Sequence, residues 1–142
     1  GKTSTKVYTN HLITGTKTVF ATPASFNNRA GVSRAINEQL TPGTDVFIAE
    51  MGTFGKGEIR ELCEFVTPKI AAITAIGPVH LERFRSEENI LKAKSEIFEN
   101  AEVCVLNVDD PRLAQLASSD KLKGKRVVTC GTSANADVRI EK

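Results

Sequence analysis

The chain has 142 residues, 40% of them hydrophobic, and 19 basic and 17 acidic residues that give a formal net charge of +2. This length predicts one compact domain, and the near-balance of charge argues against a nucleic-acid-binding protein. No apolar run approaches the ~20 residues of a membrane span, and the polar N-terminus does not resemble a signal peptide. The 3 widely spaced cysteines predict reduced thiols in a cytoplasmic protein, with neither a disulfide framework nor a zinc site.

Helix-like and strand-like apolar patterns alternate along the chain, and glycine, proline and polar turns separate them. In chain order, the patterns predict a helix at 3–13 closed by Gly15, a strand at 18–21, a helix at 32–40, a strand at 45–49, a helix at 58–66, a strand at 70–76, a helix at 86–98, a strand at 103–106, a helix starting at Asp110-Pro111, a strand at 126–130 and a last strand at 138–140. Apolar strands that alternate with helices predict an α/β fold, with a mostly parallel sheet and helices on both faces.

The first residues, Gly1-Lys2-Thr3-Ser4, open the first predicted helix. A phosphate-binding loop ends in this way, with backbone N–H groups and a lysine that meet phosphate oxygens and a hydroxyl that binds magnesium. Lys2 would then contact the β- and γ-phosphates, and Thr3 would be the magnesium ligand. Taken alone, the tripeptide Gly-Lys-Thr also fits an ordinary polar N-terminus.

Two further polar residues follow predicted buried strands. Glu50 comes after Val46–Ala49, and His80 comes after Ile70–Ile76. Ligands of parallel α/β sheets bind outside the carboxyl ends of the strands, so both side chains are candidate magnesium ligands. The alternatives are a solvated glutamate at the end of a strand and a packed or solvated histidine.

Lys94 lies among apolar residues in the predicted helix 86–98. Ile90, Leu91, Ile97 and Phe98 are three or four positions away from it, so the pattern places Lys94 on the buried face. It is either a lysine held near a functional site or one whose stem packs while its ammonium reaches water.

The loop after the second predicted element carries Asn27 and Asn28, which either shape a turn or present amides to a polar substrate. His11 and Asp109-Asp110 are typical of surface and helix-capping positions. Cys63, Cys104 and Cys130 fall at core positions without a partner base, which argues against a thiol nucleophile.

Together these residues resemble the central, P-loop NTPase-like ATP-binding domain of the Mur ligase family. The segments that carry the resemblance occur in the expected order: Gly1-Lys-Thr-Ser4, Asn27-Asn28 followed by Gly31-Val32, Ile48-Ala-Glu50-Met-Gly52 with Gly57-Glu58-Ile59, and His80-Leu-Glu-x-Phe84 followed by Ala93-Lys94-x-Glu96-Ile97-Phe98. The double asparagine and the Gly-Glu-Ile segment favour the branch of the family that adds D-alanyl-D-alanine to UDP-N-acetylmuramoyl-tripeptide.

The resemblance implies an ATP-dependent carboxylate–amine ligase of peptidoglycan precursor synthesis that works through an acyl phosphate. Its cofactors would be ATP and Mg²⁺, and its partners a UDP-linked muramoyl peptide and a dipeptide amine, with no nucleic acid or membrane. By position, residues 1–4 would bind ATP, Thr3, Glu50 and His80 would hold magnesium, and Asn27 and Asn28 would bind substrate. Lys94 and His80 would be catalytic, and Lys94 would supply a further metal ligand if it is carbamylated.

Because the chain begins at Gly1, inside the phosphate loop of that pattern, we expect residues 1–142 to be a partial central domain that is inert by itself. Three alternatives remain at this stage. One is another ligase of the same type, acting on a different amino acid, a folate or a peptide polymer. The others are a P-loop phosphotransferase or NTPase, and a purely structural or interaction fragment.

Overall fold

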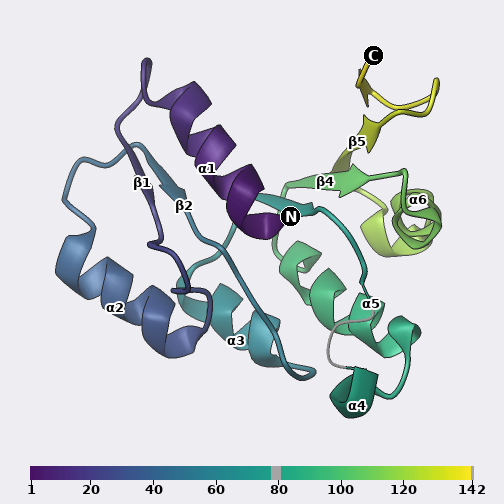
Figure 1. Cartoon of the computed structure of the whole chain (residues 1–142), viewed down its shortest axis with the longest axis horizontal. Coiled ribbons are helices and arrows are strands. Elements are labelled where there is room, and N and C mark those ends of the chain that lie inside the picture. The colour runs from purple at the N-terminus through teal and green to yellow at the C-terminus, as the bar shows by residue number, and fades with distance from the viewer. Residues whose placement is uncertain (78–80, 142) are drawn as a thin grey trace. The chain divides into compact units, whose positions relative to one another are not determined.

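A computed structural model describes the chain except for residues 78–80 and 142 (Figure 1). The chain divides into two compact units, Gly1–Gly52 and Thr53–Lys142. Every strand pair among the described residues is parallel. The predicted α/β class with parallel sheets is therefore confirmed. Within the described part of the chain, no helix is both long enough and apolar enough to cross a membrane.

The first unit has two helices and a two-stranded sheet, and its two strands lie side by side in Figure 1. Its elements are α1 (Lys2–Ile13), β1 (Val19–Ala21), α2 (Arg29–Gln39) and β2 (Val46–Ile48). The register pairs Val19 with Val46 and Ala21 with Ile48, so both strands end at the same edge of the sheet. This edge is where ligands bind in parallel α/β sheets.

The predicted glycine cap of the first helix is wrong. Helix α1 ends at Ile13, and Thr14 follows it with right-handed backbone angles. The Thr14 hydroxyl donates to the Asn10 carbonyl at 2.6 Å, and the Thr16 and Lys17 amides donate to the Ile13 carbonyl. Because these groups satisfy carbonyls at the end of the helix, no left-handed glycine is needed at position 15.

The second unit is built on a four-stranded sheet with the order β3-β4-β5-β6. Its elements are α3 (Glu58–Phe65), β3 (Ile70–Ile73), α4 (Leu81–Phe84), α5 (Glu87–Ser95), the 3₁₀ turn η1 (Glu96–Phe98), β4 (Val103–Asn107), α6 (Pro111–Ala117), the 3₁₀ turn η2 (Asp120–Leu122), β5 (Arg126–Gly131) and β6 (Val138–Arg139). As predicted, Asp110 caps α6, and Pro111 occupies its first turn.

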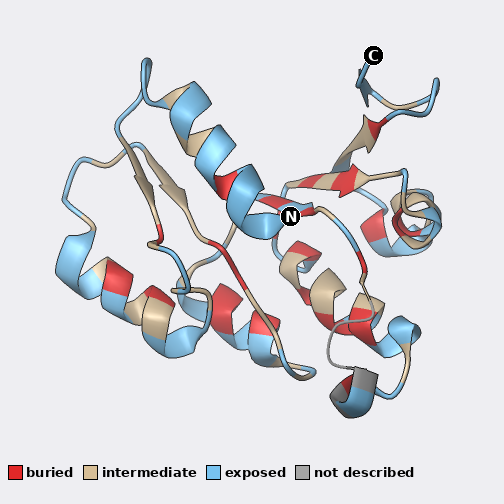
Figure 2. Cartoon of the chain, in the orientation of Figure 1, coloured by how far each residue is buried: buried red, intermediate tan, exposed pale blue. Residues whose placement is uncertain are grey.

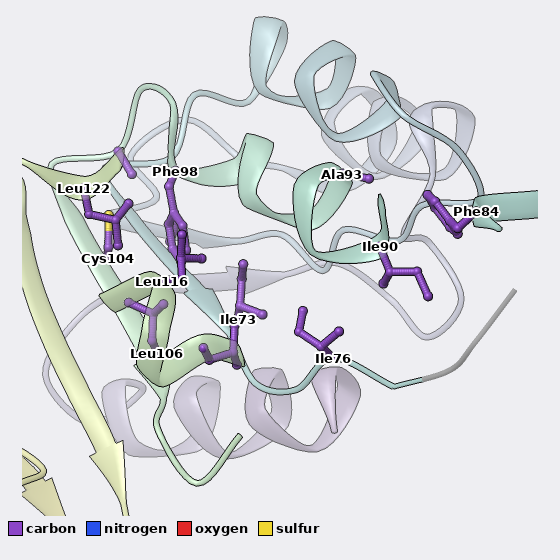
Figure 3. Packing of buried hydrophobic residues seen from close by; sticks show 13 residues of the cluster. Ile73, Ile76, Phe84, Ile90, Ala93, Phe98, Cys104, Leu106, Leu116 and Leu122 are labelled. Carbon is purple, nitrogen blue, oxygen red and sulfur yellow. The ribbon is translucent and has the colours of Figure 1, made fainter. Parts of the chain in front are cut away.

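One apolar cluster fills the interior of the second unit (Figure 3). Ala71 and Ile73 of β3 pair in register with Cys104 and Leu106 of β4, so these four side chains share one face of the sheet. Helices α5 and α6 add buried residues to this cluster, and these appear as red segments of the ribbon in Figure 2. The opposite face of β3 is open, because Ile70 is 65% exposed. The prediction that this strand is buried throughout is therefore wrong.

Two predicted elements are shorter than their apolar patterns. Strand β3 stops at Ile73, since the next three carbonyls accept hydrogen bonds from side chains instead of a neighbouring strand. Helix α5 gives way to a 3₁₀ turn after Ser95, whose hydroxyl donates to the Leu91 carbonyl at 2.5 Å. Such bonding to the preceding turn commonly bends helices.

Candidate functional site

The candidate site of the first unit lies where β1 and β2 end. Glu50 follows β2 by two residues and is only 8% exposed. Its amide donates to the hydroxyl of Thr22, a buried residue that directly follows β1, at 3.1 Å. The Thr22 amide in turn donates to the Ile48 carbonyl at 3.0 Å. The ends of the two strands therefore fix each other, and they fix the backbone that carries Glu50.

The Glu50 carboxylate accepts hydrogen bonds from two of the other predicted site residues. Its Oε1 accepts from the Thr3 hydroxyl at 3.2 Å and from the Asn27 side-chain amide at 3.4 Å. Thr3 comes from the first turn of α1, and Asn27 from the loop before α2. The structure therefore brings Thr3 and Glu50 together, and the alternative of a solvated glutamate is wrong because Glu50 is buried. Their binding of magnesium remains a prediction.

A glycine allows Asn27 to approach this carboxylate. The Gly52 amide donates to the Asn27 carbonyl at 2.6 Å. A Cβ atom at position 52 would lie 3.2 Å from the Asn27 side-chain carbon Cγ, which is tighter than ordinary packing allows. A larger residue at position 52 would therefore require the Asn27 side chain to shift by a few tenths of an ångström.

Lys6 also belongs to this site, and the sequence analysis missed it. Its ammonium lies 3.2 Å from Glu50 Oε2 and donates to the Pro23 carbonyl at 3.3 Å. Lys6 is 7% exposed and is the buried residue of α1. The sequence did contain a signal, because Lys6 is three positions after Thr3 and therefore shares its face of the helix.

Glu50 Oε2 lies next to the Lys6 ammonium but accepts no hydrogen bond from any described residue, although it is buried. A buried carboxylate with unused acceptor capacity on Oε2 and a threonine hydroxyl on Oε1 suits Mg²⁺, which prefers oxygen ligands. Among the described residues, no cluster of three or more His, Cys, Asp or Glu side chains could hold a metal by itself. The donor set therefore fits Mg²⁺ that keeps waters and takes its other ligands from a substrate.

Burial by itself would raise the pKa of Glu50, but contacts with Lys6, Thr3 and Asn27 outweigh it and hold this pKa below its ordinary value. The carboxylate is therefore ionised at neutral pH. A charged oxygen is the form that a divalent cation requires.

The other predicted ATP-binding residues lie at the start of α1. Gly1 is the N-terminal cap residue, and Lys2 and Ser4 lie exposed in the first turn. Gly1 supplies no capping side chain, so the first amides of α1 have no side-chain cap. Their contacts with ATP remain a prediction.

Asn28 has a local structural role. It is the N-cap of α2, and its side-chain oxygen accepts from the Gly31 amide at 2.9 Å. This is the capping geometry that favours asparagine before a helix. Substrate binding by Asn28 remains a prediction.

In the second unit, Lys94 is half-buried, while Ile90 and Ala93 are the buried residues of α5. The apolar pattern therefore overstated its burial, because the helix ends one residue later and turns. The Lys94 ammonium donates to the Ala75 carbonyl at 2.9 Å. His80 lies outside the described residues.

Lys94 is one of three side chains that bind consecutive carbonyls where the chain leaves β3. Asn107 of β4 donates to the Thr74 carbonyl at 3.1 Å, and Arg112 of α6 donates to the Ile76 carbonyl. Asp110 completes the arrangement by accepting from the Ile76 amide at 3.0 Å. The sequence analysis missed the roles of Asn107 and Arg112, because the identity of a polar residue does not specify which distant carbonyl its side chain binds.

Asp110 was expected at a surface or helix-capping position; it caps α6, and its side chain is only 10% exposed. Hydrogen bonds from the Arg112 side chain are the main cause that lowers its pKa to about 2, against the opposing effect of burial. Its neighbour Asp109 is exposed, as expected, and accepts from the Thr132 amide at 2.8 Å.

Of the three cysteines, Cys63 and Cys104 are buried, as predicted, and Cys130 is half-buried. Burial, helped by the charges of Glu99 and Glu96, raises the pKa of Cys63 to about 11. Burial also raises the pKa of Cys104 and of Cys130. Thiols with raised pKa values are poor nucleophiles at neutral pH.

The fold and the site define a parallel α/β domain that brings a helix N-terminus, a threonine and a buried carboxylate to the carboxyl ends of its strands. The sequence model of the Mur ligase middle domain matches residues 1–142. The chain belongs to this family.

Relatives of known name agree with this assignment. The chain is 36% identical over 141 residues to the UDP-N-acetylmuramoyl-tripeptide--D-alanyl-D-alanine ligase of Mycobacterium bovis, covering 97% of this chain and 27% of that protein. It is 33% identical over 144 residues to the ligase of the same name from Bacillus subtilis, covering 99% of this chain and 30% of that protein. The chain therefore spans less than a third of the length of these relatives.

Solved structures give the same result. The MurF ligase of Thermotoga maritima in complex with ADP matches with a TM-score of 0.89 and 27% identity, covering 100% of this chain and 33% of that one. A MurF structure from Acinetobacter baumannii matches with a TM-score of 0.85 and 27% identity, covering 94% of this chain and 29% of that one.

Proposed function

We propose that the chain is part of the central domain of a cytoplasmic, ATP-dependent ligase that joins D-alanyl-D-alanine to UDP-N-acetylmuramoyl-tripeptide in peptidoglycan precursor synthesis. The observation that carries this proposal is the buried Glu50 carboxylate beside Thr3 in the first turn of α1. The names of the relatives support the substrate pair. The ADP bound in the Thermotoga maritima structure supports a nucleotide.

Residues 1–4 would bind the phosphates of ATP. The first amides of a helix lack partners within the helix and carry the positive end of its dipole. Lys2 adds a full positive charge in the same turn. This combination favours a polyphosphate over a neutral ligand.

Thr3 and Glu50 would hold Mg²⁺, through the Thr3 hydroxyl, which lies 3.2 Å from Oε1, and through Oε2 of the same carboxylate, which has unused acceptor capacity. When bound, the metal would offset the negative charge of the phosphates. Asn27 would orient Glu50 and, with Asn28, remains a candidate for contact with the substrate.

In the proposed reaction, an oxygen of the substrate carboxylate attacks the γ-phosphorus of ATP, and ADP leaves. The dipeptide amine then attacks the acyl carbon of the acyl phosphate, the tetrahedral intermediate expels phosphate, and the amine loses a proton. Such transfers depend mainly on positioning and on compensation of charge. Lys2 would hold the phosphoryl oxygens, and His80 and Lys94 would serve as metal-site and catalytic residues.

Carbamylation of Lys94 is part of this proposal. The Lys94 ammonium would first lose one proton, and the neutral amine would then add to carbon dioxide, forming an N–C bond and releasing a second proton, so that a cation becomes a carboxylate-like ligand. Lys94→Ala should therefore abolish ligation, and added short-chain carboxylates should partly restore it. An alanine variant that stays fully active in buffer depleted of carbon dioxide would show that Lys94 only packs its stem and reaches solvent.

The decisive experiment measures ADP release by the intact ligase with UDP-N-acetylmuramoyl-tripeptide and D-alanyl-D-alanine. We expect ADP release to require both substrates and Mg²⁺, and to be lost in Glu50→Gln. Glu38→Gln, which changes an exposed glutamate of the same unit, is the matched control and should retain activity.

Two results would overturn the proposal. Full activity with a different precursor and amine, but none with this pair, would identify another ligase of the family. ADP release that needs no amine would instead identify a phosphotransferase or an NTPase.

A further inference from the structure

We infer that Lys6 acts as a placeholder cation: it compensates the Glu50 carboxylate in the metal-free site and keeps the affinity for free divalent cations low, so that the metal enters together with the nucleotide. This inference rests on the proposed function, since it concerns the same magnesium site. It assigns a role to a residue that the reaction itself does not use.

The first argument is burial. Lys6 and Glu50 are 7% and 8% exposed, and the ammonium lies 3.2 Å from Oε2. Two charges this far from water are tolerated only when they compensate each other. In the absence of a metal, the Lys6 ammonium is the charged partner of Glu50 in the contacts of the first unit.

The second argument is geometry. Lys6 contacts Oε2 as an ion pair without a hydrogen bond, whereas Oε1 is bound by Thr3 and Asn27. Oε2 is therefore the oxygen that still has unused acceptor capacity. The ammonium also donates to the Pro23 carbonyl at 3.3 Å. Lys6 consequently keeps a hydrogen-bond acceptor when a metal takes Oε2, and it need not leave the site.

The third argument is the charge balance. Glu50 contributes one negative charge, and Lys6 cancels it, so a free divalent cation meets a site with no net attraction. The phosphates of a nucleotide add several negative charges and reverse this balance. The metal is then held by the nucleotide and Glu50 together, with Lys6 still in place.

The test measures binding of Mn²⁺, as a spectroscopic substitute for Mg²⁺, by electron paramagnetic resonance in the intact ligase. Lys6→Met should bind free Mn²⁺ at least tenfold more tightly than the wild type. Lys6→Arg, which keeps the charge, and Lys17→Met, which removes an exposed lysine of the same unit, should bind it as weakly as the wild type. In a chelator, Lys6→Met should also melt at a lower temperature than the wild type. Adding Mn²⁺ should remove this difference in melting temperature.

Lys6→Gln serves as the second variant, because its neutral amide retains a donor for the Pro23 carbonyl if the methionine variant fails to fold. Wild-type affinity for free Mn²⁺ in a folded, neutral variant would overturn the role of Lys6. Adding ADP separates this result from a failure of the proposed function. If ADP does not tighten Mn²⁺ binding in the wild type, the proposed magnesium site is wrong. If ADP tightens Mn²⁺ binding but the neutral variants bind free Mn²⁺ with wild-type affinity, only the inference about Lys6 fails.

Discussion

The first unit buries three polar side chains, Lys6, Thr22 and Glu50, next to a small set of apolar ones. The second unit buries a continuous apolar cluster, and among its described residues Glu96 is the one buried charged side chain. Both oxygens of that carboxylate accept hydrogen bonds, from the Gly57 amide at 2.9 and 3.1 Å and from the Arg60 amide at 3.2 Å, and so the carboxylate caps α3. By contrast, Glu50 keeps one oxygen without a hydrogen bond.

This difference separates charges that stabilise the fold from charges that serve a ligand. A buried carboxylate whose two oxygens both accept hydrogen bonds from the backbone amides of one helix start stabilises the fold. A buried carboxylate that is held on one oxygen and only ion-paired on the other is stable enough to fold and can still bind a cation. The second unit therefore depends on apolar packing, and the first unit depends on a compensated polar site.

The largest expected effect is on the apolar packing of the second unit. Phe98 is among its largest fully buried side chains, so Phe98→Ala should lower the free energy of unfolding by ~3–5 kcal/mol. Phe65→Ala is the matched control, because Phe65 is 42% exposed, and it should lower that free energy by less than ~1 kcal/mol. Urea titration followed by circular dichroism measures both, and equal losses would contradict the placement of the core.

The sequence predicted most of this second unit and less of the first. Apolar periodicity located the strands and helices, because burial on one face repeats with a fixed spacing. It could not predict that β3 stops at Ile73, since that end depends on Asn107, Lys94 and Arg112 arriving from distant positions. Motif and strand position identified Thr3 and Glu50 as candidate site residues. Lys6 was missed because its burial depends on a carboxylate 44 positions away in the sequence.

A second prediction concerns the polar site of the first unit. Glu50→Gln and Lys6→Met should each lower the free energy of unfolding by about 3 kcal/mol in a chelator, because each leaves one buried charge without its partner. The double variant should lose clearly less than the sum of the single losses. Simple additivity in the same urea titrations would mean that the two charges do not compensate each other.

The third prediction tests the carboxylate that fixes the end of β3. The pKa of Asp110 is lowered to about 2 from an ordinary value of 3.8, chiefly by the Arg112 side chain. A carboxyl with a lowered pKa contributes stability that is complete above its ordinary pKa and is lost as the pH falls through about 4 to 2. The contribution should be roughly 1–2 kcal/mol, allowing for the partial exposure of Arg112.

Asp110→Asn should remove this contribution at neutral pH and flatten the loss of stability between pH 4 and 2. Asp109→Asn is the control, since Asp109 is exposed and does not contact Arg112 in the described hydrogen bonds. Thermal melts across this pH range measure both variants, and an unchanged pH profile in Asp110→Asn would contradict the assignment.

The smallest expected effect separates the two neighbouring asparagines. Asn28 gives its side-chain oxygen to the Gly31 amide, whereas the Asn27 amide contacts Glu50. Asn28→Ala should therefore lower the free energy of unfolding by about 1 kcal/mol, the usual value of an N-cap, and Asn28→Ser should restore most of it. Asn27→Ala should lower stability less but reduce Mn²⁺ binding in the presence of ADP, because Glu50 loses one of the donors that orient it. If the folded serine variant of Asn28 still raised the KM for the muramoyl substrate severalfold, the cap would not be its only role, and the predicted contact with substrate would gain direct support.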